Sequence, residues 1–277
     1  MKCHFLKFVF FLLSFGSFFS ATSQVLNLSK KDSIKGDFTA FSVDNIGNVY
    51  LSHQDVITKL NVNLDTIFST SLKAHFPTFI QAVKNFRILT FDQERGIVQF
   101  FDNTLTPLTD GLNLYDLDMV QPILVCESFN GNSFWVLDAG TLRLLKVNEA
   151  FKVITEIENL SFLTSTEILP TEMIEYNDLL YILIPNQYIL VFDAFGTLIQ
   201  KLPTKTEWIS IYKNAILQFN FPYFQFVNKL LVDSEMACKW PLPDIKSFHI
   251  SNKFLFVLTK SGFFRGKINQ PTPAKNN

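Results

Sequence analysis

The stretch Asp44-Asn45-Ile46-Gly47-Asn48-Val49-Tyr50 joins a tight turn directly to a short apolar strand. Asp, Asn and Gly tolerate the positive φ angles of hairpin turns, and Val and Tyr favour strands. Another apolar run, residues 38–43, precedes the turn. The stretch therefore predicts a β-hairpin, and its turn composition is the pattern to follow through the rest of the chain.

Five further copies of this strand–turn–strand pattern follow. Apolar triplets centred on residues 50, 89, 136, 182, 217 and 257 lie 35 to 47 residues apart, each after a turn that contains Asn. A third strand follows each triplet, and a fourth follows in five of the six units. Four-stranded units that repeat about every 40–50 residues are typical of β-propeller blades. The sequence therefore predicts an all-β, six-bladed β-propeller with four antiparallel strands in each blade.

The outer strands differ among the six units. In the second unit the outer strand is expected at residues 105–108, whereas the sixth unit ends after its third strand, near Ile268. A blade without its outer strand would expose an unpaired edge, which promotes aggregation. The apolar segment Val25-Leu26-Asn27-Leu28 belongs to no unit. We expect this N-terminal segment to supply the missing strand and to close the ring.

The repeat architecture resembles that of the six-bladed β-propellers of the NHL and related families, over residues 25–269. The best local match is the opening stretch, which is similar to the Asp-x-x-Gly-Asn-x-Tyr turn and strand common in such blades. The later units keep an Asn or Gly turn and lose the rest of the motif, so the resemblance concerns the fold. Propellers include both binding modules and enzymes, and the fold alone assigns no function.

Composition and charge exclude several classes of protein. Hydrophobic residues make up 48% of the 277 positions and charged residues 18%, which excludes a disordered chain or a coiled coil. The net charge of -1 gives no electrostatic footprint for nucleic acid. We expect a monomer without a nucleic-acid partner.

The N-terminus has the three-part pattern of an export signal. Lys2 and Lys7 supply positive charge, residues 8–19 are mostly apolar, and Ala21-Thr22-Ser23 offers small residues for cleavage before Gln24. The apolar run is shorter than the roughly 20 residues that span a bilayer. No cysteine lies near the cleavage point, which argues against a lipoprotein. We expect a signal peptide at 1–23, a propeller at 24–269, a disordered tail at 270–277, and export from a bacterial cell to the periplasm or the medium.

The sequence holds no nucleophile elbow, phosphate loop or zinc-helix motif of the types G-x-S-x-G, G-x-x-x-x-G-K-[ST] or H-E-x-x-H. His53, His75 and His249 lie in three different units without a partner at metal-ligand spacing. We interpret them as histidines bonded within the propeller, although His249 lies on an innermost strand and could face the channel. Cys126 and Cys238 fall in different blades, and we expect both to be buried free thiols.

The resemblance to six-bladed propellers leaves one enzyme hypothesis. Members that act as lactonases or related hydrolases hold a divalent metal at the channel mouth with acidic and amide side chains. Alternation along residues 171–175 places Glu172 and Glu175 on opposite faces, so the acidic side chains cannot all converge. Glu127 and Glu172 are the candidate ligands, with calcium or magnesium as the ion. The carboxylates on or beside innermost strands are Glu127, Glu172, Glu175, Glu207 and Asp244.

Aromatic residues are the remaining candidates. Residues 219–226 contain five aromatic side chains, most of which we expect in the core between blades. Aromatic residues exposed at a loop would instead mark a contact with a protein or a glycan, and Tyr115 and Phe129 are candidates for that role.

These observations favour an exported binding or scaffold module of the cell envelope, without catalytic activity and without a cofactor. Its partner is expected to be an envelope protein or a glycan, bound where the loops between blades gather. The alternative is the metal-dependent hydrolase.

Overall fold

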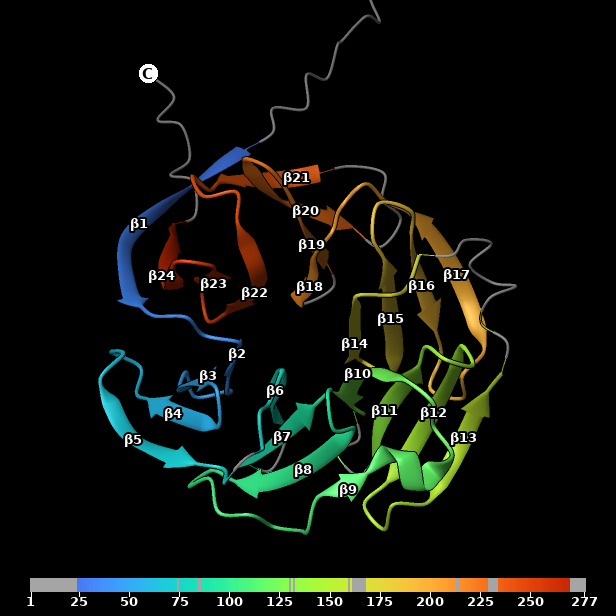
Figure 1. Ribbon diagram of the computed structural model, residues 1–277. Helices are drawn as coiled ribbons and strands as arrows, with labels where there is room; N and C mark the ends of the chain where they lie inside the picture. The colour runs from blue at the N-terminus through green and yellow to red at the C-terminus, as the bar shows by residue number, and fades with distance from the viewer. Residues whose placement is uncertain are drawn as a thin grey trace, which may run out of the picture.

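The computed structural model describes residues 24–73, 75–83, 86–129, 131, 133–158, 160, 168–212, 215–228 and 234–269. The expected signal peptide and the expected tail lie outside these ranges. The described chain forms a ring of six four-stranded antiparallel blades (Figure 1), which confirms the predicted fold class. Among the described residues no helix is both long enough and apolar enough to cross a membrane.

The first three blades are formed in chain order, each from its innermost strand outward. Blade 1 contains β2 (Ala40–Val43), β3 (Val49–His53), β4 (Val56–Leu60) and β5 (Thr66–Ser71). Blade 2 contains β6 (Phe79–Val83), β7 (Arg87–Asp92), β8 (Ile97–Asp102) and β9 (Leu112–Asn113), followed by the 3-10 helix η2 (Leu114–Leu117). Blade 3 contains β10 (Pro122–Glu127), β11 (Ser133–Asp138), β12 (Arg143–Asn148) and β13 (Val153–Ile157).

The next two blades repeat this order, and the last one takes its outer strand from the N-terminus. Blade 4 contains β14 (Glu172–Tyr176), β15 (Leu179–Ile184), β16 (Tyr188–Phe192) and β17 (Leu198–Pro203). Blade 5 contains β18 (Ile209–Tyr212), β19 (Ala215–Asn220), β20 (Tyr223–Asn228) and β21 (Ser234–Lys239). Blade 6 contains β22 (Ile245–Ser251), β23 (Phe254–Thr259), β24 (Gly262–Asn269) and β1 (Gln24–Lys35).

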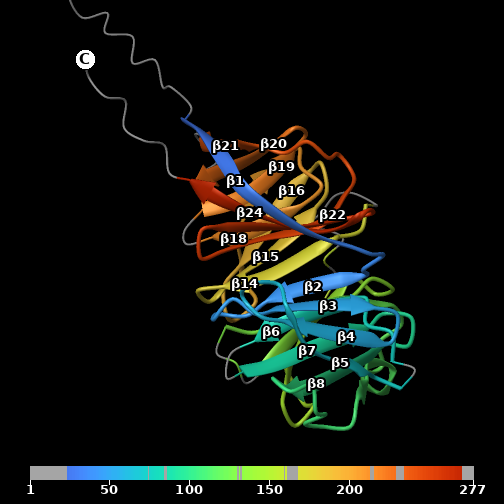
Figure 2. The same cartoon turned by 90° about the vertical axis from the view of Figure 1, so that its left-hand side faces the viewer.

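Strand β1 closes the ring, as the strand count predicted, and is longer than expected. Residues 27–35 pair antiparallel with β24, and residues 24–26 pair in parallel with β21 of blade 5. Figure 2 shows β1 running between these two strands along the outside of the ring. Arg265 of β24 donates to Asp32 of β1 at 2.6 Å and to the backbone carbonyl of Val62 in blade 1. One guanidinium therefore connects the closing strand to its blade and to the next blade.

Blade 2 departs from the expected strand positions. Its outer strand β9 lies at residues 112–113, and in the expected segment only Pro107 forms a bridge, to Phe101. The reason is local: Leu105 has a φ of 62° and donates its N–H to the carbonyl of Asp102, so residues 102–106 form the turn. The prediction of a strand at 105–108 was wrong because two of its residues are needed to reverse the chain.

Four turns between the third and fourth strands share one geometry that the sequence analysis missed. In each, an Asn or Asp Oδ1 accepts the backbone N–H groups two and four residues later, at 2.8 to 3.0 Å; the four residues are Asn61, Asp102, Asn148 and Asp193. The residue three positions after the Asn or Asp has a left-handed φ of 57° to 86°. It is Leu64, Leu105, Phe151 or Gly196. Asp44 accepts from Ile46 and Asn48 in the same way, with Gly47 left-handed. The opening motif of blade 1 is therefore this same turn, used between different strands.

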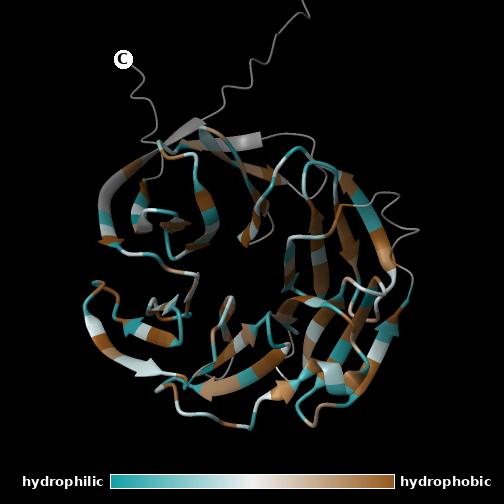
Figure 3. Cartoon of the chain, in the orientation of Figure 1, coloured by the Kyte–Doolittle hydropathy of each residue, from teal (hydrophilic) through white to brown (hydrophobic). Residues whose placement is uncertain are grey.

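The core consists of apolar clusters, one at each of the six interfaces between neighbouring blades. Figure 3 shows brown apolar segments concentrated on the strands and teal polar segments on the turns. Between blades 5 and 6 the cluster is largely aromatic, with ring centroids of Phe224 and Phe248 4.8 Å apart. Each blade thus buries both faces of its sheet, and the ring needs no second layer.

Phe219, Phe224 and Phe226 are buried, as expected for most of the aromatic segment, whereas Phe221 and Tyr223 are exposed at the turn. Cys126 and Cys238 are both buried, in blades 3 and 5, and form no disulfide with each other.

Candidate functional site

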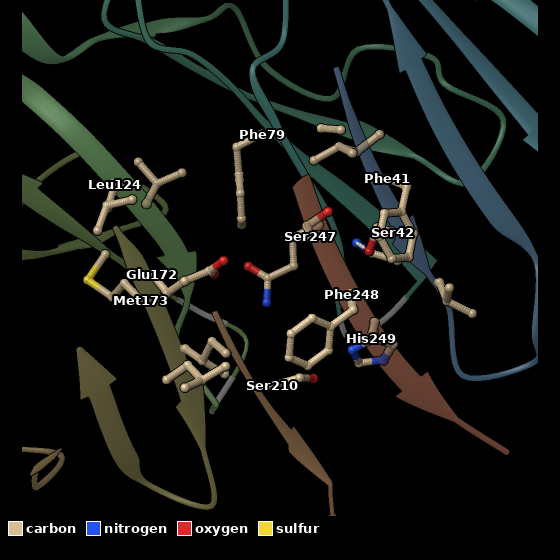
Figure 4. A pocket seen from close by; sticks show the side chains of 18 of the residues that line it. Phe41, Ser42, Phe79, Leu124, Glu172, Met173, Ser210, Ser247, Phe248 and His249 are labelled. Atoms are coloured by element: carbon tan, nitrogen blue, oxygen red, sulfur yellow. Dashed lines mark hydrogen bonds between the residues drawn. The ribbon is translucent and has the colours of Figure 1, made fainter. Parts of the chain in front are cut away.

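A large cavity lies along the ring axis. It has a volume of about 790 Å³, and all six innermost strands (β2, β6, β10, β14, β18 and β22) contribute to its wall. Glu172 projects into this channel from β14, and Ser247, Phe248 and His249 lie along β22 on the other side (Figure 4). A cavity built from every blade is the default binding site of such a ring.

Two acidic residues line the channel, Glu172 and Glu175, and Glu172 is the one whose side chain is unpaired among the described residues. Its side chain is half-buried and has no hydrogen-bond or ion-pair partner among the described residues. The surrounding protein removes water from the carboxyl group and raises its pKa to about 8. At neutral pH this group therefore holds a proton and can donate a hydrogen bond.

His249 is another titratable group in the channel, on β22. It is also half-buried and has no described side-chain partner, so the interpretation of His249 as a histidine bonded within the propeller was wrong; it faces the channel instead. The same loss of hydration lowers its pKa to about 4, so the imidazole is neutral at neutral pH. The channel wall is thus polar at these two points without carrying their charge.

Glu127 lies outside the channel. It is the last residue of β10, is buried, and has the Arg87 guanidinium 3.8 Å from its carboxylate. The neighbouring Ser128 donates to Glu175 at 3.1 Å, which places the end of β10 beside the fourth residue of β14. Glu172 begins β14, and three residues of strand span about 10 Å. The structure therefore does not bring Glu127 and Glu172 together.

Two of the other candidate carboxylates are engaged elsewhere. Glu175 accepts from the Trp135 indole, and Glu207 accepts from the Asn186 amide at 3.3 Å. Among the described residues no group of three or more His, Cys, Asp and Glu side chains could hold a metal ion. The calcium or magnesium site of the hydrolase alternative stays a prediction.

The remaining two histidines are bonded within the propeller, as expected. His75 Nε2 lies 3.0 Å from Thr90 Oγ1, and its other ring nitrogen lies 3.7 Å from the Asp92 carboxylate. His53 Nδ1 contacts the Asp37 carbonyl. Both therefore stabilise local structure at the start or end of strands.

A second candidate site lies on the side of the ring where the innermost strands begin, here called the entry face. It carries the connections between successive blades and the turns between second and third strands. Phe76, Arg95 and Tyr115 gather on it: the Arg95 guanidinium lies 4.8 Å from the Phe76 ring centre, and the Tyr115 ring packs on Gly96. A Cβ at Gly96 would lie 2.7 Å from that ring, so the glycine permits the contact.

The aromatic and arginine side chains of this cluster are exposed and held in place. Phe76 and Tyr115 are 39% and 42% exposed, and the Arg95 side chain is 42% exposed. Asp92 accepts from the Arg95 guanidinium at 3.0 Å and from the Phe76 N–H at 2.9 Å. Phe129, the other aromatic candidate, is half-buried on the opposite face.

No family model matches the chain, and no curated protein matches it. The solved structures it resembles include the virginiamycin B lyase of Staphylococcus aureus, with a TM-score of 0.63, 10% identity, and coverage of 87% of this chain and 100% of that chain. A streptogramin B lyase has a TM-score of 0.60 at 10% identity, covering 87% of this chain and 97% of the other. BBS1N, solved in complex with ARL6DN, has a TM-score of 0.57 at 12% identity, covering 81% and 76%.

These neighbours differ in kind, since two are lyases and one was solved bound to another protein. At 10 to 12% identity the likeness concerns the fold alone. The expected relation to NHL-type propellers is accordingly supported at the level of architecture and not at the level of family. By its strands, its ring and its structural neighbours, the chain is a six-bladed β-propeller.

Proposed function

We propose that this propeller is an exported, non-catalytic binding module of the cell envelope that docks a protein partner on its entry face. The observation that carries the proposal is the exposed cluster of Phe76, Arg95 and Tyr115. Tyrosine and arginine are enriched among the residues that dominate protein–protein binding energy. Their preorganisation by Asp92 and Gly96 reduces the entropy lost on binding.

The channel supports a binding role over the hydrolase alternative. A metal-dependent hydrolase needs several carboxylates that converge on one point, and Glu127 and Glu172 are separated along the axis. Glu172 is also neutral at neutral pH and is thus a weak ligand for a hard cation until it loses its proton.

Variant-dependent crosslinking tests the docking proposal. Tagged wild-type protein, Tyr115→Ala and Phe76→Ala are each crosslinked in an envelope extract, and the captured species are compared by mass. Phe195→Ala is the matched control, because Phe195 is 84% exposed in the turn before β17, on the opposite face. One species captured by wild type and control, and lost in both cluster variants, is the expected result. A species captured equally by all four proteins would contradict the proposal.

Export rests on the pattern of residues 1–23, and its test is separate. The protein is recovered from cytosolic, periplasmic and external fractions of the producing cells, and its N-terminus is sequenced. We expect a mature chain that begins at Gln24 outside the cytosol. An intact N-terminus in the cytosol would contradict export and leave the docking proposal standing.

A further inference from the structure

A smaller pocket lies on the entry face at the junction of blades 4 and 5, away from the Phe76 cluster. Its volume is about 280 Å³, just below the usual range of pockets for drug-sized ligands, roughly 300–1,000 Å³. Four separate loops form it. The residues that line it are Asn186, Lys205, Glu207, Trp208, Phe219, Asn220, Phe221 and Pro243. Its size suits one ring-sized ligand.

Three aromatic side chains line the pocket, and together they are called its aromatic wall. Phe219 is buried, Trp208 is half-buried, and Phe221 is 58% exposed at the rim. Phe219 contacts both neighbours edge to face, with its centroid 6.4 Å from each. The aromatic rings thus offer an apolar surface that stays partly open to solvent. Contact of this surface with water is unfavourable, and exposed apolar surface often marks a binding site.

Polar groups of mixed type complete the pocket. Asn186 and Asn220 each carry both donor and acceptor atoms, Glu207 accepts, and Lys205 donates. Asn186 Nδ2 donates to Glu207 Oε1 at 3.3 Å, which leaves further donor and acceptor capacity on both groups. One acidic and one basic residue give the pocket no net charge, so its chemistry favours a neutral ligand.

A buried threonine fixes the aromatic wall. The Thr206 side chain, 1% exposed, has its hydroxyl 2.9 Å from the carbonyls of both Trp208 and Phe219. The Asn186 N–H donates to the Thr206 carbonyl at 2.9 Å, which connects the blade 4 turn to the same loop. The pocket is therefore preformed by hydrogen bonds of Thr206, from its hydroxyl and its carbonyl, to the loops of two blades.

We propose that this pocket binds a single neutral pyranose ring, the terminal or internal sugar of a glycan. A pyranose has an apolar face of C–H groups that can stack on an aromatic ring, and an edge of hydroxyls that both donate and accept hydrogen bonds. Phe221 and Trp208 match the face, while Asn186, Glu207 and Lys205 match the edge. This site stands on its own contacts and does not depend on docking at the Phe76 cluster.

Tryptophan fluorescence of the purified full-length protein provides the test, because Trp208 lines the pocket and the other two tryptophans, Trp135 and Trp240, are fully buried. The probes are the methyl glycosides of glucose, galactose, mannose and N-acetylglucosamine. At least one is expected to change the emission in a saturable way. Phe221→Ala is expected to raise its Kd about tenfold by removing the stacking surface.

Glu207→Gln, which keeps the shape and removes the strong acceptor, is expected to raise the Kd about fivefold. Phe195→Ala on the opposite face is the matched control and is expected to bind as wild type does. Thermal melting of each variant confirms that the fold is retained. Acetyl-proline amide is added as a ring-sized probe that is not a sugar. The proposal would be overturned if none of the four glycosides bound, if Phe221→Ala left their binding unchanged, or if only acetyl-proline amide bound.

Discussion

The outer rim and the axial channel of this ring treat polar side chains in opposite ways. At the rim, Arg265 is bonded to Asp32 and to the Val62 carbonyl. In the channel, Glu172 and His249 have no described partner and are held neutral. The rim is therefore built for stability, whereas the channel keeps two polar groups that stability alone does not explain. Departures of this kind are expected where a fold serves a function.

Removal of β1 is the strongest way to break the rim. Deletion of residues 24–35 takes away the outer strand of blade 6, with the half-buried side chains Leu28 and Ile34 and the partner of Arg265. We expect the free energy of unfolding to fall by about 5 kcal/mol. The melting temperature should fall by roughly 10 °C or more in a thermal scan followed by circular dichroism.

Deletion of residues 24–26 alone is the matched control for this variant. Those residues pair only with β21, in parallel, and the pairing of β1 with β24 stays intact. The loss should then be about 1 kcal/mol. A melting temperature that is unchanged after deletion of the whole strand would show that the ring does not close through β1.

The channel should reveal itself through pH. An unfolded glutamate has a pKa near 4.5, and Glu172 in the folded chain has one of about 8. Between these values the unfolded chain loses a proton that the folded chain keeps, so the free energy of unfolding falls as pH rises. Glu172→Gln removes this effect and should be more stable than wild type by roughly 3 to 5 kcal/mol at pH 9, and nearly equal to it at pH 4.

His249 acts on the other side of the pH scale. Its pKa of about 4 in the folded chain lies below the ordinary value of 6.5, so the unfolded chain gains a proton first on acidification. Wild type should therefore lose roughly 3 kcal/mol between pH 6.5 and pH 4 through this group, and His249→Asn should lose less. Urea unfolding across pH 4 to 9 measures both effects. Parallel pH profiles for wild type and both variants would show that the channel groups are hydrated and unperturbed.

Single arginines allow a finer comparison within the rim. Arg265, 8% exposed, joins three segments, whereas Arg143 pairs with Glu156 of its own blade at 3.0 Å and with one loop carbonyl. We expect Arg265→Ala to cost about 2 kcal/mol and Arg143→Ala about 1 kcal/mol. A double-mutant cycle with Asp32→Ala should give a positive coupling to Arg265 and none to Arg143. Equal losses would mean that the closing contact has no special role.

The sequence predicted the ring because its information is local. Apolar triplets and the Asn-containing turns before them are read directly along the chain. Counting strands showed that the sixth unit lacks its outer strand and located that strand near Val25 and Leu28. The position of the outer strand in blade 2 could not be read in this way, since Leu105, an apolar residue, takes a left-handed conformation that its side chain disfavours.

The candidate sites were less accessible to sequence analysis. Glu172 was identified from its place on an innermost strand, and the same argument selected Glu127, which the structure places against Arg87 outside the channel. Tyr115 was identified as an exposed aromatic, but its neighbours Phe76 and Arg95 come from other segments. Contacts between segments depend on the ring itself, and a single sequence does not contain them. One usable signal was overlooked: the recurrence of Asn or Asp at the end of each third strand.

That recurrent turn provides a smaller test at the rim. Asn148→Ala removes the acceptor for the N–H groups of Ala150 and Lys152 and should cost about 1 kcal/mol, as loss of a comparable cap does at a helix start. Asn148→Asp keeps the acceptor and should melt within about 1 °C of wild type. Urea unfolding measures the difference. A loss of the same size in both variants would show that the turn does not depend on this oxygen.

Metal addition is expected to have the smallest effect, and it separates the binding module from the hydrolase. A cation that binds only the folded state, at a free concentration 100 times its Kd, adds about 2.7 kcal/mol to the free energy of unfolding. That gain would raise the melting temperature by several degrees. Because Glu172 is protonated at pH 7 and Glu127 lies apart from it, calcium or magnesium should shift the melting temperature by less than about 1 °C relative to EDTA. A larger shift that disappears in Glu172→Ala and persists in Glu127→Ala would place an ion in the channel through Glu172 alone. That result would restore the hydrolase alternative, and it would also explain why a carboxyl group is kept at the axis without a protein partner.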